Sequence, residues 1–153
     1  MNMNMNKYSF LLGLSLLLAG VAGVKAQARP DDIAGTWQTH GDKTARILIY
    51  KSGEKFYGKI VQLQFPEQDG KPRLDQKNPD RQKQGRPILG MELLTGFLFD
   101  KDEWNGGHIY DPESGKTYSC TLTLKDRRTL KVRGYVGISL FGRTEVWTRV
   151  EAP

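Results

Sequence analysis

The stretch "IAGTWQTH", Ile33–His40, decides the fold that this sequence predicts. It has a counterpart near the end of the chain in "VWTRV", Val146–Val150. A closed barrel makes its first and last strands neighbours, so we expect Trp37 and Arg149 to meet although they are far apart in sequence. Gly35 allows a tight bend, the indole plugs the narrow end, and the guanidinium stacks on it in a cation–π contact worth about 0.5 to 2 kcal/mol.

Alternation of apolar and polar residues runs through most of the chain beyond this stretch. The segment "ARILIYKSGEKFYGKIVQL", residues 45–63, reads as two strands joined by a hairpin turn at Ser52 and Gly53. Residues 105–107, "NGG", and residues 111–115, "DPESG", read as turns. Together with the remaining short segments this predicts about eight to ten strands and an all-β fold, an antiparallel barrel or a sandwich.

A second hairpin is expected in "TYSCTLTLKDRRTLKVRGYVG", residues 117–137. Cys120 and Leu122 share one face of its first strand, and Val132 and Val136 share one face of its second. Cys120 is the only cysteine, so an internal disulfide is excluded. Its alternation with leucines predicts a small buried apolar residue rather than a reactive thiol.

The first residues have the layout of a secretory signal. Lys7 precedes an apolar run over residues 8–24, and small residues follow at a cleavage site. We expect residues 1–26 to be a cleaved signal peptide and residues 27–153 to form one domain. The protein would then be exported, either periplasmic or secreted, with no membrane span after cleavage.

The charge of the chain is mildly basic. It carries 23 Lys and Arg against 17 Asp and Glu, a formal net charge of +6. The basic run over residues 124–133 reads as a solvated hairpin, although an anionic-surface site stays open. An exported domain without a recognition motif is not expected to bind nucleic acid.

The residues offer no recognisable catalytic set. The histidines, His40 and His108, fall on separate strands, and neither stands in a motif with a serine or with Cys120. We therefore expect a protein that is not an enzyme and that needs no cofactor.

A long polar segment, residues 64–87, interrupts the strand pattern. It either caps an opening of the barrel or makes a solvated excursion. Asp75, Asn78 and Asp80 carry the oxygen ligands that Ca²⁺ prefers, but their spacing is not that of an EF-hand and Arg86 adds positive charge. We expect bonds between the Asp and Arg side chains rather than a metal site.

Aromatic residues are spread over most of the expected strands. A small barrel either fills its interior with such groups or lines a ligand cavity with them. The candidate ligand-binding residues are Tyr57, Asp75, Asn78, Asp80, Arg86, Trp104, Tyr110 and Trp147.

The motifs also carry a family resemblance. "GTW" on the first strand with a basic residue on the last resembles the calycins, which include the lipocalins and fatty-acid-binding proteins. "RILIYKSGEKFYGKIV", "DQKNPD", "RPILGMELLTGF", "WNGGHIYDPESGKTYSCTLTLK" and "LKVRGYVGISLFGRTEVWTR" resemble an exported bacterial family, the domain of unknown function DUF2147, over residues 35–149. The resemblance implies a secreted, lipocalin-like β-barrel with no established activity.

Two functions fit these expectations. The first is an exported protein that binds a small, at least partly apolar ligand inside the barrel. The alternative is a filled barrel whose surface binds an envelope component or another protein. A cavity of several hundred Å³ would favour the first.

Overall fold

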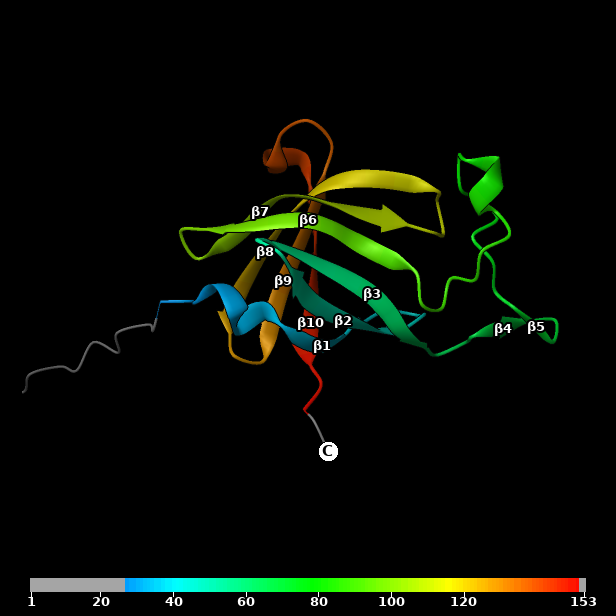
Figure 1. Cartoon of the computed structure of the whole chain (residues 1–153), viewed down its shortest axis with the longest axis horizontal. Helices are drawn as coiled ribbons and strands as arrows, with labels where there is room; N and C mark the ends of the chain where they lie inside the picture. Colours follow the sequence, from blue (N-terminus) through cyan, green and yellow to red (C-terminus); the bar gives the residue numbers. More distant parts are fainter. Residues whose placement is uncertain (1–26, 152–153) are drawn as a thin grey trace, which may run out of the picture.

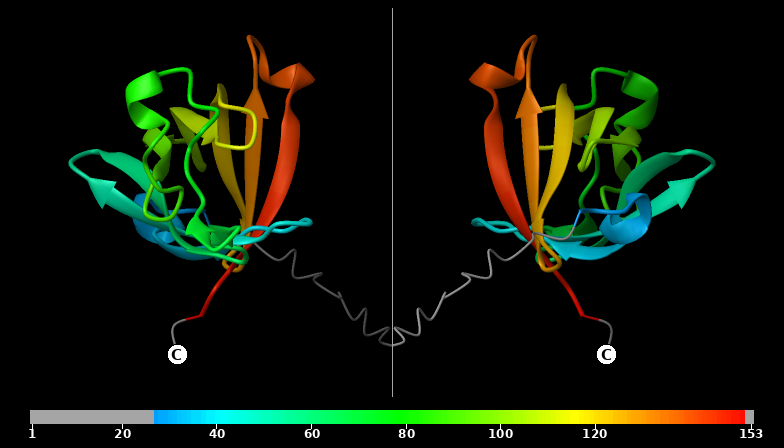
Figure 2. Two further views of the ribbon diagram at one scale, coloured as in Figure 1. Left: turned by 90° about the vertical axis from the view of Figure 1, so that its right-hand side faces the viewer. Right: turned by 90° about the vertical axis from the view of Figure 1, so that its left-hand side faces the viewer.

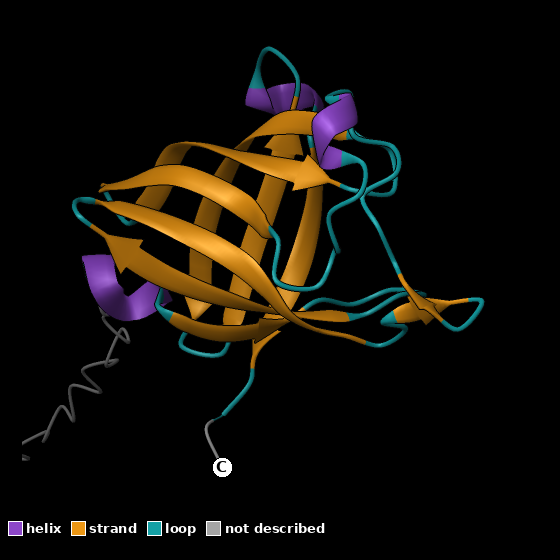
Figure 3. Cartoon of the chain, turned by 45° about the vertical axis from the view of Figure 1, so that its right-hand side comes forward, coloured by secondary structure: helices purple, strands orange, loops and turns teal. Residues whose placement is uncertain are grey.

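The computed structural model describes residues 27–151, and the expected signal peptide, residues 1–26, lies outside them. In the described part, eight antiparallel strands close into one barrel in the order β1-β10-β9-β8-β7-β6-β3-β2 (Figures 1 and 3). The all-β barrel expected from the sequence is confirmed. The barrel strands are β1 (Gly35–Gln38), β2 (Ala45–Ser52), β3 (Lys55–Leu63), β6 (Glu92–Asp100), β7 (Glu103–Asp111), β8 (Lys116–Asp126), β9 (Thr129–Tyr135) and β10 (Arg143–Arg149).

Closure depends on the short strand β1, which pairs with β10 on one side and β2 on the other. Trp37 stands opposite Arg149 in the first pairing and opposite Ile47 in the second. The first and last strands are therefore neighbours, and the barrel ribbon has no free edge there.

The remaining elements are short. Two two-residue strands, β4 (Glu67–Gln68) and β5 (Lys71–Pro72), form a separate hairpin that extends away from the barrel (Figure 1). Three 3₁₀ turns complete the described chain: η1 (Pro30–Ile33), η2 (Arg81–Lys83) and η3 (Ser139–Phe141). Among residues 27–151, no helix has the length and apolar character needed to cross a membrane.

The core runs through the barrel, and its aromatic part lies next to η1. Its largest fully buried side chains are Trp37, Trp104, Trp147, Phe56 and Phe97. Phe56 and Trp104 meet edge to face with ring centroids 6.4 Å apart, a favoured aromatic arrangement. Trp37 and Trp104 also donate to the carbonyl oxygens of Ile33 and Pro30, so aromatic rings pack directly on η1.

One expected turn is wrong. Asn105–Gly107 lies inside β7, where the pairing with β8 shifts between Trp104 and Gly107. A Cβ on Gly107 would lie 2.5 Å from the Phe97 ring, and Gly106 has a φ of +73°. The glycines therefore make a β-bulge over which a buried ring packs, and the chain does not reverse.

The end of the second hairpin also differs from expectation. β9 stops at Tyr135, and Val136 is 75% exposed rather than buried with Val132. The strand ends there because the next residue, Gly137, has a φ of +73° and turns the chain. The expected hairpin at Ser52 and Gly53 and the buried position of Cys120 are both confirmed.

Candidate functional site

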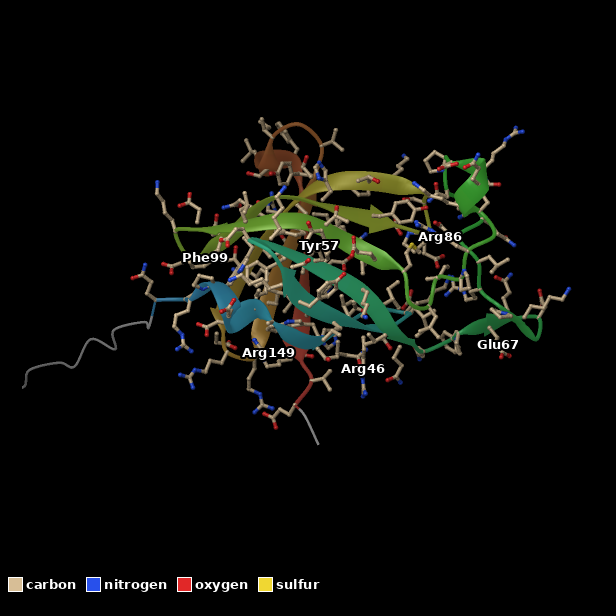
Figure 4. The ribbon with its side chains drawn as sticks, in the orientation of Figure 1. Arg46, Tyr57, Glu67, Arg86, Phe99 and Arg149 are labelled. Atoms are coloured by element: carbon tan, nitrogen blue, oxygen red, sulfur yellow. The ribbon has the colours of Figure 1, made fainter. Side chains whose placement is uncertain are left out.

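The end of the barrel next to η1 is closed. The Trp37 Nε1 donates to the carbonyl oxygen of Ile33 at 2.9 Å, and the guanidinium carbon of Arg149 lies 4.2 Å from the Trp37 ring centroid. Arg149 Nη1 donates to the Ala34 carbonyl at 2.8 Å. Figure 4 shows Arg149 beneath the barrel at the level of η1. This end offers no room for a ligand because its polar atoms are paired and its ring is fully buried.

Gly35 is required at this end for two reasons. Its φ is +128°, a conformation that side chains rarely adopt. A Cβ on Gly35 would also lie 2.8 Å from Arg149 Nη1. Burial lowers the pKa of Arg149, and the nearby Asp32 carboxylate opposes that shift.

The opposite end, which we call the mouth, is surrounded by the four connections 39–44, 64–91, 112–115 and 136–142. The left view of Figure 2 looks toward it. A cavity of about 400 Å³ opens there between β7, β8, β9 and β10. Its apolar lining includes Ile109, Tyr118, Val132, Gly134, Val136 and Phe141. This cavity is within the usual range for small-ligand sites, roughly 300 to 1,000 Å³.

Three charged side chains also line the mouth cavity. They are Asp111, Arg143 and Glu145, and an Arg143 Nη2 lies 4.0 Å from a Glu145 carboxylate oxygen. The Arg143 side chain is 88% exposed, so this pair is weak and free to exchange partners. The cavity therefore combines apolar side chains with side chains of both charges, and Glu145 lies as deep as Val132, its partner across the strands.

The long segment between β3 and β6 is anchored beside the mouth by the buried carboxylate of Asp75. Asp75 accepts hydrogen bonds from Arg86 Nε at 3.0 Å, Asn78 Nδ2 at 2.8 Å and the Tyr110 hydroxyl at 2.6 Å. Burial, together with the bond to Asp75, raises the pKa of Tyr110 to about 12. The expected pairing of Asp and Arg side chains is present, and it ties the segment to the barrel at Asp75 while most of its other residues are exposed.

A second anchor of the same segment is Glu113, in the turn between β7 and β8. Its carboxylate pairs with Lys43 Nζ at 3.0 Å and with Arg73, and its carbonyl oxygen accepts from Lys77 Nζ at 2.6 Å. Burial alone would raise the pKa of Glu113, but the bonds from Lys43 and Arg73 outweigh it and lower that pKa. Three connections of the mouth are therefore joined at one carboxylate.

A polar hollow of about 560 Å³ lies over this anchor. Its lining includes Lys43, Lys71, Arg73, Lys77 and Glu113. Three of its cations already contact Glu113. Four cations line the hollow against the two acids Asp69 and Glu113, so its lining is polar and basic, and the mouth cavity is the better candidate for an apolar ligand.

The structure distributes the candidate ligand-binding residues over several places. It brings together Asp75, Asn78, Arg86 and Tyr110 in the network described above. Asp80 caps η2 by accepting from the Gln82 backbone N–H at 3.0 Å. The other three lie apart: Trp104 and Trp147 are in the aromatic core, and Tyr57 stacks on Tyr50 with ring centroids 6.0 Å apart.

The cavity that the structure shows is lined by other residues than these eight. Figure 4 labels Tyr57 and Arg86, and neither is part of the lining. Ile109, Tyr118 and Val132 were not among the expected ligand-binding residues, although strand alternation could have indicated Tyr118 and Val132. Tyr118 is in phase with the buried Cys120, and Val132 is in phase with the buried Leu130, so they continue the inner face of their strands toward the mouth.

Comparison with known proteins gives a family and a fold. A family model described as "Uncharacterized protein conserved in bacteria (DUF2147)" matches residues 35–149. A similar solved structure is described as "Protein HP1028 from the human pathogen Helicobacter pylori belongs to the lipocalin family". It is 23% identical, the match covers 82% of this chain and 85% of that chain, and the TM-score is 0.69. No curated protein matches the chain.

Proposed function

The chain belongs to the DUF2147 family of uncharacterised bacterial proteins, and from this premise we propose that it is an exported protein that binds a small, partly apolar ligand in the mouth cavity. The observation that carries the proposal is the cavity of about 400 Å³ at the open end of a lipocalin-like barrel. Barrels of this strand number either fill their interior with side chains or hold one small ligand.

The two ends of the barrel differ, because one is filled with side chains and the other keeps a cavity. Aromatic side chains fill the closed end, whereas the mouth end keeps an apolar hollow between Ile109, Tyr118 and Val132. Burying an apolar group against these side chains is favourable in proportion to the area removed from water. The charged side chains in the lining support a ligand that also carries a polar or charged group.

The same proposal holds that the protein binds its ligand and does not catalyse a reaction. The described histidines are on different elements: His40 contacts Thr148, and His108 lies on the exposed side of β7. The Cys120 thiol is buried, and burial raises its pKa to about 12, which suppresses the thiolate that a nucleophile needs.

The direct test fills the cavity. A Cβ on Gly134 would make ordinary contacts, 3.5 Å to Ile109 Cγ2 and 3.7 Å to Tyr118 Cβ, so Gly134→Leu projects its side chain into the hollow. We expect this variant to lose binding of an apolar fluorescent probe, anilinonaphthalene sulfonate, while its urea unfolding stays close to that of the parent. Gly85→Leu is the matched control, because a Cβ on Gly85 meets open space. Equal probe binding by the parent and Gly134→Leu would refute the site.

Native mass spectrometry of the purified protein identifies the natural ligand. We expect a small molecule to co-purify with the parent and to be missing from Gly134→Leu. Export is tested on the same material by N-terminal sequencing, which we expect to begin at Gln27 or Arg29. A sequence that begins at Met1 would contradict cleavage.

A filled interaction module is the second candidate. The aromatic core favours it, since most of the barrel interior is occupied by side chains. It predicts that Gly134→Leu leaves binding of a protein partner unchanged and that no small molecule co-purifies.

A further inference from the structure

The connection between β9 and β10, residues 136–142, exposes a group of apolar side chains beside the cavity; we call it the mouth loop. Val136 is 75% exposed, Ile138 60%, Leu140 75% and Phe141 80%. Single exposed apolar residues are ordinary, but a contiguous group marks an interaction site. Figures 1 and 2 show this loop standing out beyond the ends of its strands.

The mouth loop is held in this exposed shape by its own hydrogen bonds. Arg133 Nε donates to the Ser139 carbonyl at 2.8 Å, Arg133 Nη2 donates to the Leu140 carbonyl at 3.2 Å, and Arg133 Nη1 donates to Thr144 Oγ1 at 2.8 Å. The Gly142 N–H donates to the Ser139 carbonyl at 3.1 Å. The loop backbone is therefore fixed while its apolar side chains face outward.

Two kinds of apolar side chain are present on the loop. Val136 and Phe141 also line the cavity, whereas Ile138 and Leu140 do not. Ile138 and Leu140 thus serve no purpose inside the cavity, and within residues 27–151 they are left largely uncovered. Their exposed surface is available to an occupant outside the barrel.

We propose that the mouth loop docks on a lipid surface that contains anionic lipid, with Ile138, Leu140 and Phe141 entering the boundary between headgroups and acyl chains. The cavity would then open at the membrane, where a partly apolar ligand is exchanged; this last step rests on the proposed function. Binding of such segments grows with buried apolar area and with attraction to anionic lipids.

The shape and the charge of the loop both favour lipid over a second copy of the chain. Four side chains on one projecting turn do not supply the roughly 800 Å² that each partner contributes to a standard stable interface. Arg133 and Arg143 stand at the base of the loop, and residues 27–153, without Lys7 and Lys25, carry 21 Lys and Arg against 17 Asp and Glu, a formal net charge of +4. Asp111 and Glu145 line the cavity together with Arg143, whereas Arg133 bonds directly to the Ser139 and Leu140 carbonyls of the loop.

The first experiment measures sedimentation with vesicles of phosphatidylcholine, with and without phosphatidylglycerol. We expect the parent to bind the anionic vesicles more strongly, and Ile138→Ser/Leu140→Ser to weaken that binding at least about tenfold. The control is Val61→Ser/Leu98→Ser, which removes two apolar side chains of lesser exposure, 42% and 47%, from other strands. We expect the control to bind as the parent does.

The second experiment locates the contact. Leu140→Trp places an indole on the loop, and the native Trp37, Trp104 and Trp147 are at most 1% exposed. We expect brominated phosphatidylcholine, mixed with phosphatidylglycerol, to quench the introduced indole and to leave the parent fluorescence almost unchanged. Both experiments use the proposed mature chain, residues 27–153, which lacks the apolar run at residues 8–24.

The outcomes separate this proposal from the proposed function. Vesicle binding that is insensitive to Ile138→Ser/Leu140→Ser, or an introduced indole that is not quenched, would overturn the membrane proposal. Self-association of the parent that the same variant abolishes, without vesicle binding, would overturn it in favour of a second copy. Gly134→Leu fills the cavity and is expected to keep vesicle binding, so failure of ligand binding alone leaves docking intact.

Discussion

The guanidinium carbon of Arg149 lies 4.2 Å from the ring centroid of Trp37, and the two residues face each other across β1 and β10. The same guanidinium donates to the carbonyl oxygens of Asp32 at 2.5 Å, Ala34 at 2.8 Å and Arg127 at 2.7 Å. One side chain therefore joins the first strand, the segment at η1 and the turn between β8 and β9. The ring fills the closed end, and the cation holds the chain that covers it.

This contact predicts a coupled loss of stability. We expect Trp37→Ala to lower the free energy of unfolding by about 3 to 5 kcal/mol, because it removes a large buried aromatic side chain. Arg149→Ala should cost less, and the double variant should cost less than the sum, since residues in contact share interaction energy. Urea denaturation of the three variants measures these losses. Arg149→Lys, which keeps the charge but not the forked donors, should fall between the parent and Arg149→Ala; additive losses would contradict the coupling.

The thiol of Cys120 is expected to resist labelling in the native protein. The side chain is fully buried between β7 and β9, and burial raises its pKa to about 12, so the reactive thiolate is scarce at neutral pH. A thiol reagent should react slowly in buffer and at once in urea. Leu98→Cys in a Cys120→Ala background is the exposed control and should react quickly in both. Rapid labelling of native Cys120 would show that this strand face opens readily.

Ionisation of the Tyr110 hydroxyl should lower the free energy of unfolding at alkaline pH. Its pKa is raised from 10.0 to about 12 by burial and by the bond to Asp75. Because the folded pKa lies above the unfolded value, this contribution is fully present below pH 10 and is lost as the pH rises from 10 through 12. Urea unfolding across this range should show a steeper fall for the parent than for Tyr110→Phe. Parallel curves would mean that the hydroxyl titrates alike in both states.

The Glu113 anchor should control opening of the long segment without controlling global unfolding. Its pKa is lowered below 4.5, so its contribution is present above that value and is lost as the pH falls through the folded pKa. The side chain is 48% exposed, which limits the effect on overall stability. We expect Glu113→Gln to lower the protection factors for amide hydrogen exchange over residues 73–78 at neutral pH, and acid to lower the same protection factors in the parent. Glu54→Gln, in the turn at the closed end, should leave that exchange unchanged.

The closed end of the barrel was predictable because its residues act through strand neighbours. Gly35, Trp37 and Arg149 stand near the two ends of the sequence, and closure of a barrel brings such ends together whatever lies between. Alternation likewise placed Cys120 on the inner face. Local pattern was sufficient in these cases because each residue's role depends on one strand and its phase.

The mouth was much less predictable because its contacts join segments that no local pattern relates. Glu113 contacts Lys43, Arg73 and Lys77, which belong to two other connections, and no sequence pattern indicates that these residues lie together.

The "NGG" motif at residues 105–107 was misinterpreted as a turn for a different reason. Glycines serve turns and bulges alike, and here the packing of Phe97 on Gly107 decides in favour of a bulge.

The pairing of β1 with β10 has a practical consequence for attaching the protein to a solid support. Both ends of the described chain leave from the rim at η1, where the Val150 N–H still donates to the Thr36 carbonyl at 2.8 Å. A biosensor chip coupled through either end would therefore hold every molecule with the mouth directed into the flowing solution. Coupling through lysines would instead engage Lys43, Lys71 and Lys77 beside the opening, and would give a mixture of orientations in which access is partly blocked.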